Sequence, residues 1–129
     1  MLRKNKFRGR TWKGEWVYGM PICLTEECFD EGTFDGIQTN YDSNEDIEPK
    51  TLGQSTTTKT KSKILIWEGD KIMWKEKEWE VLWNEDYSGY MINRSMNPHG
   101  ENDMKRLDCD IAIESVVIGT IYDGKTYNE

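Results

Sequence analysis

The chain has 129 residues, of which 32% are charged and 36% are hydrophobic. This length suits one compact domain, and every apolar run is far shorter than the roughly 20 residues of a membrane-spanning helix. No apolar stretch follows the basic start, so we expect no export signal. The three cysteines are an odd number, which argues against a disulfide framework and predicts a reducing, cytoplasmic location.

Cationic residues cluster at the start of the chain. The formal net charge is -7, yet residues 1–13 contain six of the seventeen Lys and Arg and no acid. The rest of the chain would repel phosphates, so any nucleic-acid contact is expected to use this basic arm. Neutralisation of the arm by the acidic body is the alternative. The candidate cations of the arm are Arg3, Lys4, Lys6, Arg8 and Arg10.

Bulky residues alternate with small or polar ones from Thr11 to Ile22. This pattern predicts a hairpin or bent strand pair, with a strand over 14–22. Residues 25–50 are acidic and rich in turn residues, which indicates short strands and loops. The polar tract Ser55–Ser62 fits either a linker or an exposed edge strand.

The clearest alternation lies between Ile64 and Ile92 and predicts an antiparallel meander. At its turn, Glu68-Gly69-Asp70, replacement of Gly69 by Val is expected to cost about 1 kcal/mol or more if the φ of Gly69 is positive. The strands of the meander are predicted over 64–67, 71–74, 79–84 and 89–92.

A polar stretch, residues 93–110, is expected to be a long loop with room for one helical turn. The apolar, β-branched run that follows predicts a closing strand over 115–122, with Gly119 at a bulge or close packing point.

These elements predict an all-β protein. An antiparallel meander would form a small, partly closed SH3-like barrel with an N-terminal β-hairpin lobe. We expect a single domain over 1–129, with an N-terminal lobe over about 1–54 and a C-terminal barrel lobe over about 61–129.

Four segments stand out in order along the chain: Phe7-Arg8 with Trp12 and Trp16–Gly19, then Thr51–Gln54, then Ile66–Asp70, and then Val117–Asp123. In sequence and in order, these segments resemble the YopX family of phage and prophage proteins. The resemblance implies an all-β fold and a phage or prophage origin, and it implies no activity. The sequence departs from the family after Gln54, where Ser55–Ser62 lacks the usual glycine-containing turn.

Two motifs could in principle bind a phosphate or a zinc ion, but the surrounding sequence supports neither. Gly119–Thr126 satisfies a phosphate-binding pattern, but only three residues follow it, too few for the helix that this mechanism needs. A zinc site could combine Cys23, Cys28, Cys109 and His99, but their spacing is loose, and cysteines often serve as small apolar residues. His99 is the only histidine and lies in the most polar loop. We therefore expect no enzyme activity, no cofactor and no metal.

Tryptophans dominate the predicted strands. By their alternation, Trp67, Trp74, Trp79 and Trp83 are core or half-buried residues, or else some of them form an exposed recognition surface. We expect a non-catalytic module that binds a host or phage protein, with a weak nucleic-acid binder as the alternative. Trp12 and Trp79 join the basic residues as candidate binding residues, and leftover apolar surface favours a homo-oligomer.

Overall fold

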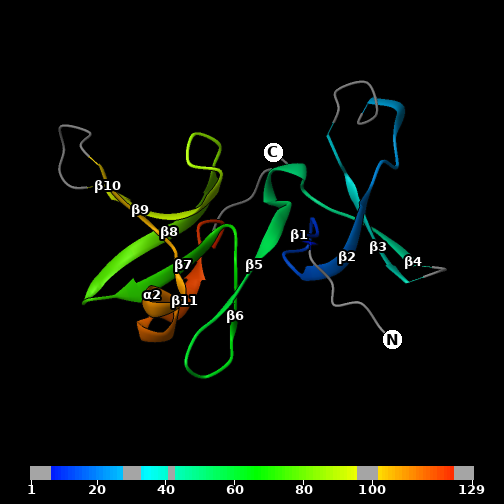
Figure 1. Ribbon diagram of the computed structural model, residues 1–129. Helices are drawn as coiled ribbons and strands as arrows, with labels where there is room; N and C mark the ends of the chain where they lie inside the picture. Colours follow the sequence, from blue (N-terminus) through cyan, green and yellow to red (C-terminus); the bar gives the residue numbers. More distant parts are fainter. Residues whose placement is uncertain (1–6, 28–32, 41–42, 96–101, 124–129) are drawn as a thin grey trace. The chain divides into compact units, whose positions relative to one another are not determined.

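The computed structural model describes residues 7–27, 33–40, 43–95 and 102–123, which form two compact units divided between Gln54 and Ser55 (Figure 1). Antiparallel strands make up most of both units, which confirms the predicted all-β class. The helix described in full is short, α2 (Cys109–Glu114).

The N-terminal unit contains the first four strands of a six-stranded antiparallel sheet, in the order β4-β3-β2-β1. Its elements are β1 (Phe7–Arg10), β2 (Trp16–Ile22), β3 (Gly36–Asn40), β4 (Ser43–Asp46) and the 3-10 helix η1 (Pro49–Thr51). The predicted hairpin is present, but its first strand is β1, which lies before the predicted stretch. A tight turn joins the two strands, because the Thr11 amide donates to the Glu15 carbonyl at 2.8 Å.

The interior of the N-terminal unit mixes apolar and polar groups. Ile37 and Ile47 are fully buried, and Arg10, Glu48 and Thr51 are buried with them. Few large apolar side chains are available in this acidic, turn-rich part of the sequence, so polar contacts take up part of the interior.

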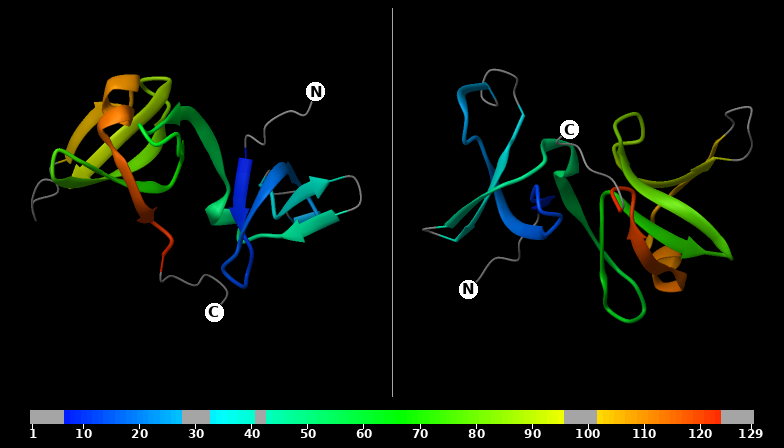
Figure 2. Two further views of the ribbon diagram at one scale, coloured as in Figure 1. Left: turned by 90° about the horizontal axis from the view of Figure 1, so that it is seen from below. Right: turned by 180° about the vertical axis from the view of Figure 1, so that it is seen from behind.

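The C-terminal unit contains a five-stranded antiparallel sheet in the order β10-β9-β8-β7-β11. The strands are β7 (Asp70–Trp74), β8 (Lys77–Asn84), β9 (Gly89–Ser95), β10 (Asn102–Arg106) and β11 (Val116–Thr120). A further pair, β5 (Gly53–Lys59) and β6 (Leu65–Trp67), precedes them. Figure 2 shows that the strands of the sheet are strongly twisted, as the chirality of the backbone favours.

The core of the C-terminal unit follows from alternation along these strands. In β7, Ile72 and Trp74 are buried while Lys71 and Met73 are half-buried. The same period in β6, β8 and β9 directs one apolar face inward. The buried cluster consists of Ile66, Ile72, Trp74, Trp79, Val81, Ile92, Leu107 and Ala112.

Several predicted strands agree closely with the structure. The ranges 64–67, 71–74, 79–84 and 89–92 correspond to β6, β7, β8 and β9, and 115–122 contains β11. The predicted bulge is confirmed, because the pairing of β11 with β7 shifts register between Val117 and Gly119.

Other predictions need correction. Within the described residues neither sheet closes on itself, and β10 and β11 form the two edges of the five-stranded sheet. The structure therefore agrees only loosely with the predicted, partly closed barrel. The predicted loop 93–110 contains β10 as well as the end of β9 and the start of α2. The apolar run that begins at Ile111 starts in α2, because the Asp108 carboxylate caps this helix by accepting from the Ile111 amide at 2.9 Å. The tract after Gln54 forms a strand, β5, as far as Lys59 rather than a linker, and this strand is not an edge strand because it lies between β1 and β6.

Candidate functional site

Arg10, one of the predicted phosphate-binding cations, lies inside the N-terminal unit. Its Nη2 is 3.0 Å from Glu48 Oε2, and both side chains are buried. The Arg10 amide donates to Thr51 Oγ1 at 2.8 Å, and the Thr51 hydroxyl donates to the Glu48 carbonyl at 2.7 Å. Arg10 therefore belongs to a buried polar network.

Arg8 is also buried, and its guanidinium lies 4.0 Å from the centre of the Trp16 ring. Burial follows from the position of β1, which pairs with β2 on one side and with the start of β5 on the other. Arg8 and Arg10 are thus not placed on an exposed basic arm. Arg3, Lys4 and Lys6 lie outside the described residues.

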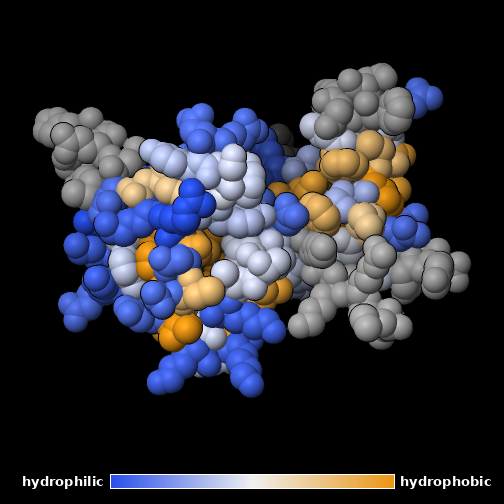
Figure 3. Space-filling model, viewed as in Figure 1, coloured by the Kyte–Doolittle hydropathy of each residue, from blue (hydrophilic) through white to orange (hydrophobic). Residues whose placement is uncertain are grey.

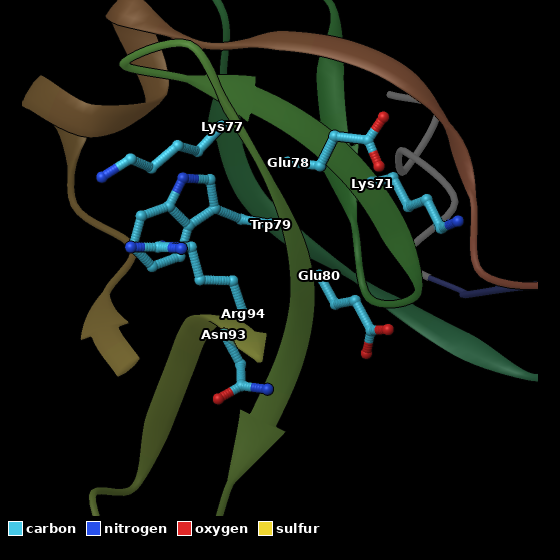
Figure 4. A pocket seen from close by; sticks show the side chains of 7 residues that line it. All are labelled: Lys71, Lys77, Glu78, Trp79, Glu80, Asn93 and Arg94. Carbon is cyan, nitrogen blue, oxygen red and sulfur yellow. The ribbon is translucent and has the colours of Figure 1, made fainter. Parts of the chain in front are cut away.

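Trp79 lies at a groove between β8 and β9, with a volume of about 420 Å³ (Figure 4). The two strands pair from Glu80 and Asn93 onward, and the paired register does not continue to Trp79 and Arg94. Beyond that point β8 follows β7, and β9 follows β10. The groove opens where the strands separate. Its lining residues are Lys71, Lys77, Glu78, Trp79, Glu80, Asn93 and Arg94.

The Trp79 ring is nevertheless poorly accessible. Its indole Nε1 donates to the Trp74 carbonyl at 3.1 Å, and the two rings are 5.6 Å apart. The Arg94 guanidinium lies 5.3 Å from the ring centre, and Arg94 Nε is 3.8 Å from Asp103 Oδ2. Trp79 therefore packs as a core residue whose edge is covered by an arginine.

The charges around the groove at Trp79 are mixed, with three cations and two carboxylates. A mixed lining of this kind favours no single charge class of ligand. No group of His, Cys, Asp and Glu suited to a metal ion occurs in the part of the chain that the structure describes.

Trp12 lies at a second groove, of about 510 Å³, in the N-terminal unit. The turn between β1 and β2 forms one wall, and β4 forms the other. Three carboxylates and one ammonium group line it, so its charge is predominantly negative. The lining residues are Thr11, Trp12, Lys13, Glu15, Asn44, Glu45 and Asp46.

The Trp12 side chain is 42% exposed, unlike most of the tryptophans of the chain. Trp67, Trp74 and Trp79 are buried, as alternation predicted, whereas Trp83 is 46% exposed. In the view of Figure 3, hydrophilic side chains cover most of the C-terminal unit, around smaller hydrophobic areas. The groove at Trp12 differs from the groove at Trp79 because its tryptophan is exposed and its lining is mainly acidic.

Sequence reasoning found Trp12 but missed the acidic residues beside it. Glu15 belongs to the hairpin turn, and Glu45 and Asp46 belong to β4, thirty residues further on. The acidic run in residues 42–46 was the available signal, but nothing in it indicates an edge strand.

The residues of the two excluded motifs lie apart. Cys23 and Cys109 are exposed and lie in different units, and Cys28 and His99 lie outside the described residues. Gly119 and Thr120 end β11, and residues 124–126 of the phosphate-binding pattern are likewise outside the described residues.

Comparison with known proteins adds no assignment, since no family model and no curated protein matches the chain. Among the described residues, no helix has both the length and the apolar character needed to cross a bilayer.

Proposed function

We propose that this chain is a non-catalytic protein-interaction module of phage or prophage origin, acting in the cytoplasm of a bacterial host. The phage origin rests on the four YopX-like segments alone. The interaction role rests on the groove at Trp12, where an exposed indole stands beside Glu15, Glu45 and Asp46. Aromatic side chains dominate the energetics of protein interfaces, and carboxylates select a basic partner.

A binding experiment with a lysine decapeptide tests this role. The full chain should bind the peptide at low salt, and Trp12→Ala should weaken binding because it removes the apolar wall of the groove. Trp83→Ala is the matched control, since Trp83 is equally exposed but lies in the other unit. Calorimetry gives the affinities. Equal affinity for all three proteins, or no binding at all, would contradict the role of this groove.

Nucleic-acid binding through the basic arm remains the alternative proposal. Burial of Arg8 and Arg10 weakens it, because two of the five candidate cations are then not exposed to phosphates. If the arm contacts phosphates, affinity for DNA or RNA should fall steeply as salt rises. Deletion of residues 2–6 should then abolish it, and the absence of binding at low salt would remove this alternative.

A further inference from the structure

In the part of the chain that the structure describes, β4 pairs only with β3 and is the end strand of its sheet, so no described strand pairs with its outer edge. The Ile47 amide donates to the Asp35 carbonyl at 3.0 Å, so residues 35 and 47 face each other as a hydrogen-bonded pair. Such pairs alternate along an antiparallel ladder. Asn44 and Asp46 therefore direct their backbone N–H and C=O groups away from β3.

This edge coincides with the groove at Trp12. Asn44, Glu45 and Asp46 form both the strand edge and one wall of the groove, and all three are exposed. An incoming strand would thus meet backbone donors and acceptors together with carboxylates and one indole. Addition of a strand to a sheet edge takes its affinity from the backbone and its selectivity from neighbouring side chains.

We infer that an extended segment rich in lysine or arginine, from a partner protein, adds as a strand to the outer edge of β4. Its cationic groups would lie beside Glu15, Glu45 and Asp46, and an aliphatic stem or cationic head would pack on Trp12. This inference rests on the proposed interaction role and specifies its mode and its partner.

The negative charge along the outer edge of β4 also disfavours two kinds of partner. Two copies of β4 side by side would place carboxylates opposite carboxylates, which destabilises a strand pair. Nucleic-acid phosphates would meet the same repulsion. Acidic side chains on an edge strand thus exclude self-pairing while favouring a basic strand.

Two peptides separate strand addition from simple charge attraction. The first is a blocked decapeptide of alternating lysine and threonine, and the second has the same sequence with every backbone amide N-methylated. Both carry the same charge and the same side-chain donors, but only the first can donate hydrogen bonds from its backbone to β4. Calorimetry with the full chain should show binding of the first peptide, and the second should bind about tenfold more weakly or worse, because several backbone bonds are lost.

A charge variant completes the experiment. Glu45→Lys should reduce affinity for the first peptide, while Glu85→Lys, in an exposed turn of the other unit, should leave it unchanged. Equal binding of the two peptides would overturn strand addition and leave the interaction role standing. Binding of neither peptide would overturn both.

Discussion

The buried pair of Arg10 and Glu48 joins two segments that are 38 residues apart in sequence. Nothing local in the sequence indicates that Arg10 is buried, because its partner follows a long acidic stretch. A basic residue near other basic residues therefore looked like part of an exposed arm. Trp79, by contrast, could be placed from its own strand, since alternation alone predicts an inward side chain.

Removal of one partner from this pair should strongly destabilise the N-terminal unit. Glu48→Gln removes the carboxylate that lies 3.0 Å from the buried Arg10 guanidinium, and we expect a loss of about 3–5 kcal/mol in the free energy of unfolding. The double variant Arg10→Met with Glu48→Leu should lose less free energy of unfolding than Arg10→Met and Glu48→Leu lose when their separate losses are added. Chemical denaturation measures each value.

The pair of Arg94 and Asp103 provides the control. Their atoms are 3.8 Å apart and their side chains are 22% and 29% exposed, so Asp103→Asn should cost less than about 1 kcal/mol. Similar losses for Asp103→Asn and Glu48→Gln would show that burial does not distinguish the two pairs.

Tyr90 links the stability of the C-terminal unit to alkaline pH. Burial raises the pKa of the Tyr90 hydroxyl, and the charge of Glu68 raises it further. The folded protein therefore keeps this proton more tightly than the unfolded chain does. The resulting stabilisation is present below the ordinary tyrosine pKa of about 10 and is lost as pH rises through the folded pKa.

Substitution of Tyr90 tests this linkage. Tyr90→Phe should remove part of the decline in the free energy of unfolding above about pH 10. Glu68→Gln should reduce the decline less, because the larger contribution, burial, remains. Denaturation at a series of pH values measures both, and an identical pH dependence in Tyr90→Phe and the parent protein would refute the linkage.

Among the elements, the turn between β6 and β7 connects several strands at Gly69. The Gly69 amide donates to the Val81 carbonyl at 2.8 Å, and its carbonyl accepts from the Ile121 amide at 2.9 Å. The Asp70 carboxylate accepts from the Trp67 amide at 2.8 Å and closes the turn. Gly69 has a φ of 91°, which meets the condition set for a costly substitution, because a residue with a side chain adopts this φ only with strain.

Gly69 and Gly14 form a matched pair for substitution, because Gly14 has a φ of 88°. A Cβ at Gly14 would meet nothing within 4 Å, whereas one at Gly69 would lie 2.9 Å from Tyr122 Cε2. Gly14→Ala should cost about 1 kcal/mol for the backbone alone. Gly69→Ala should cost more, and Gly69→Val more again. Thermal and chemical unfolding give the values, and equal losses for the two alanine variants would exclude a role for Tyr122.

The predicted elements differ from the observed ones where the sequence lacks alternation. β4 reads Ser-Asn-Glu-Asp and β10 reads Asn-Asp-Met-Lys-Arg, and both are edge strands that bury little. Without a buried face, an edge strand leaves no periodic pattern to detect. The prediction over Ile111–Ile113 was wrong for the opposite reason. These residues are apolar, but a short apolar run fits a helix or a strand equally well. Only the capping residue Asp108 favoured the helix.

At the level of the whole molecule, the two sheets end in different ways. β4 is acidic, whereas β11 carries Val116 at 61% and Ile118 at 44% exposure, and Ile113 on α2 is also exposed. β11 ends its sheet within the described residues. An exposed apolar strand edge favours association with another chain, so the expected homo-oligomer stays a prediction with β11 as its proposed contact.

Light scattering over a range of concentrations should therefore report a mass above that of one chain. Val116→Lys with Ile118→Lys should lower this mass, because the added charges oppose burial of the edge. Met20→Lys is the control, since Met20 is 60% exposed in the N-terminal unit. A monomer at every concentration would contradict the prediction.

The division of the chain inside β5 has a practical consequence for protein engineering. Gly53 and Gln54 pair with β1, while Ser55 and Lys59 pair with β6, so the boundary between units falls within a strand. Domains are usually joined by an exposed linker, which accepts a tag or an inserted domain. Here an insertion at the boundary would interrupt a strand. The turn at residues 85–88 is the better place for a reporter, because all four of its residues are exposed and it lies outside the strands.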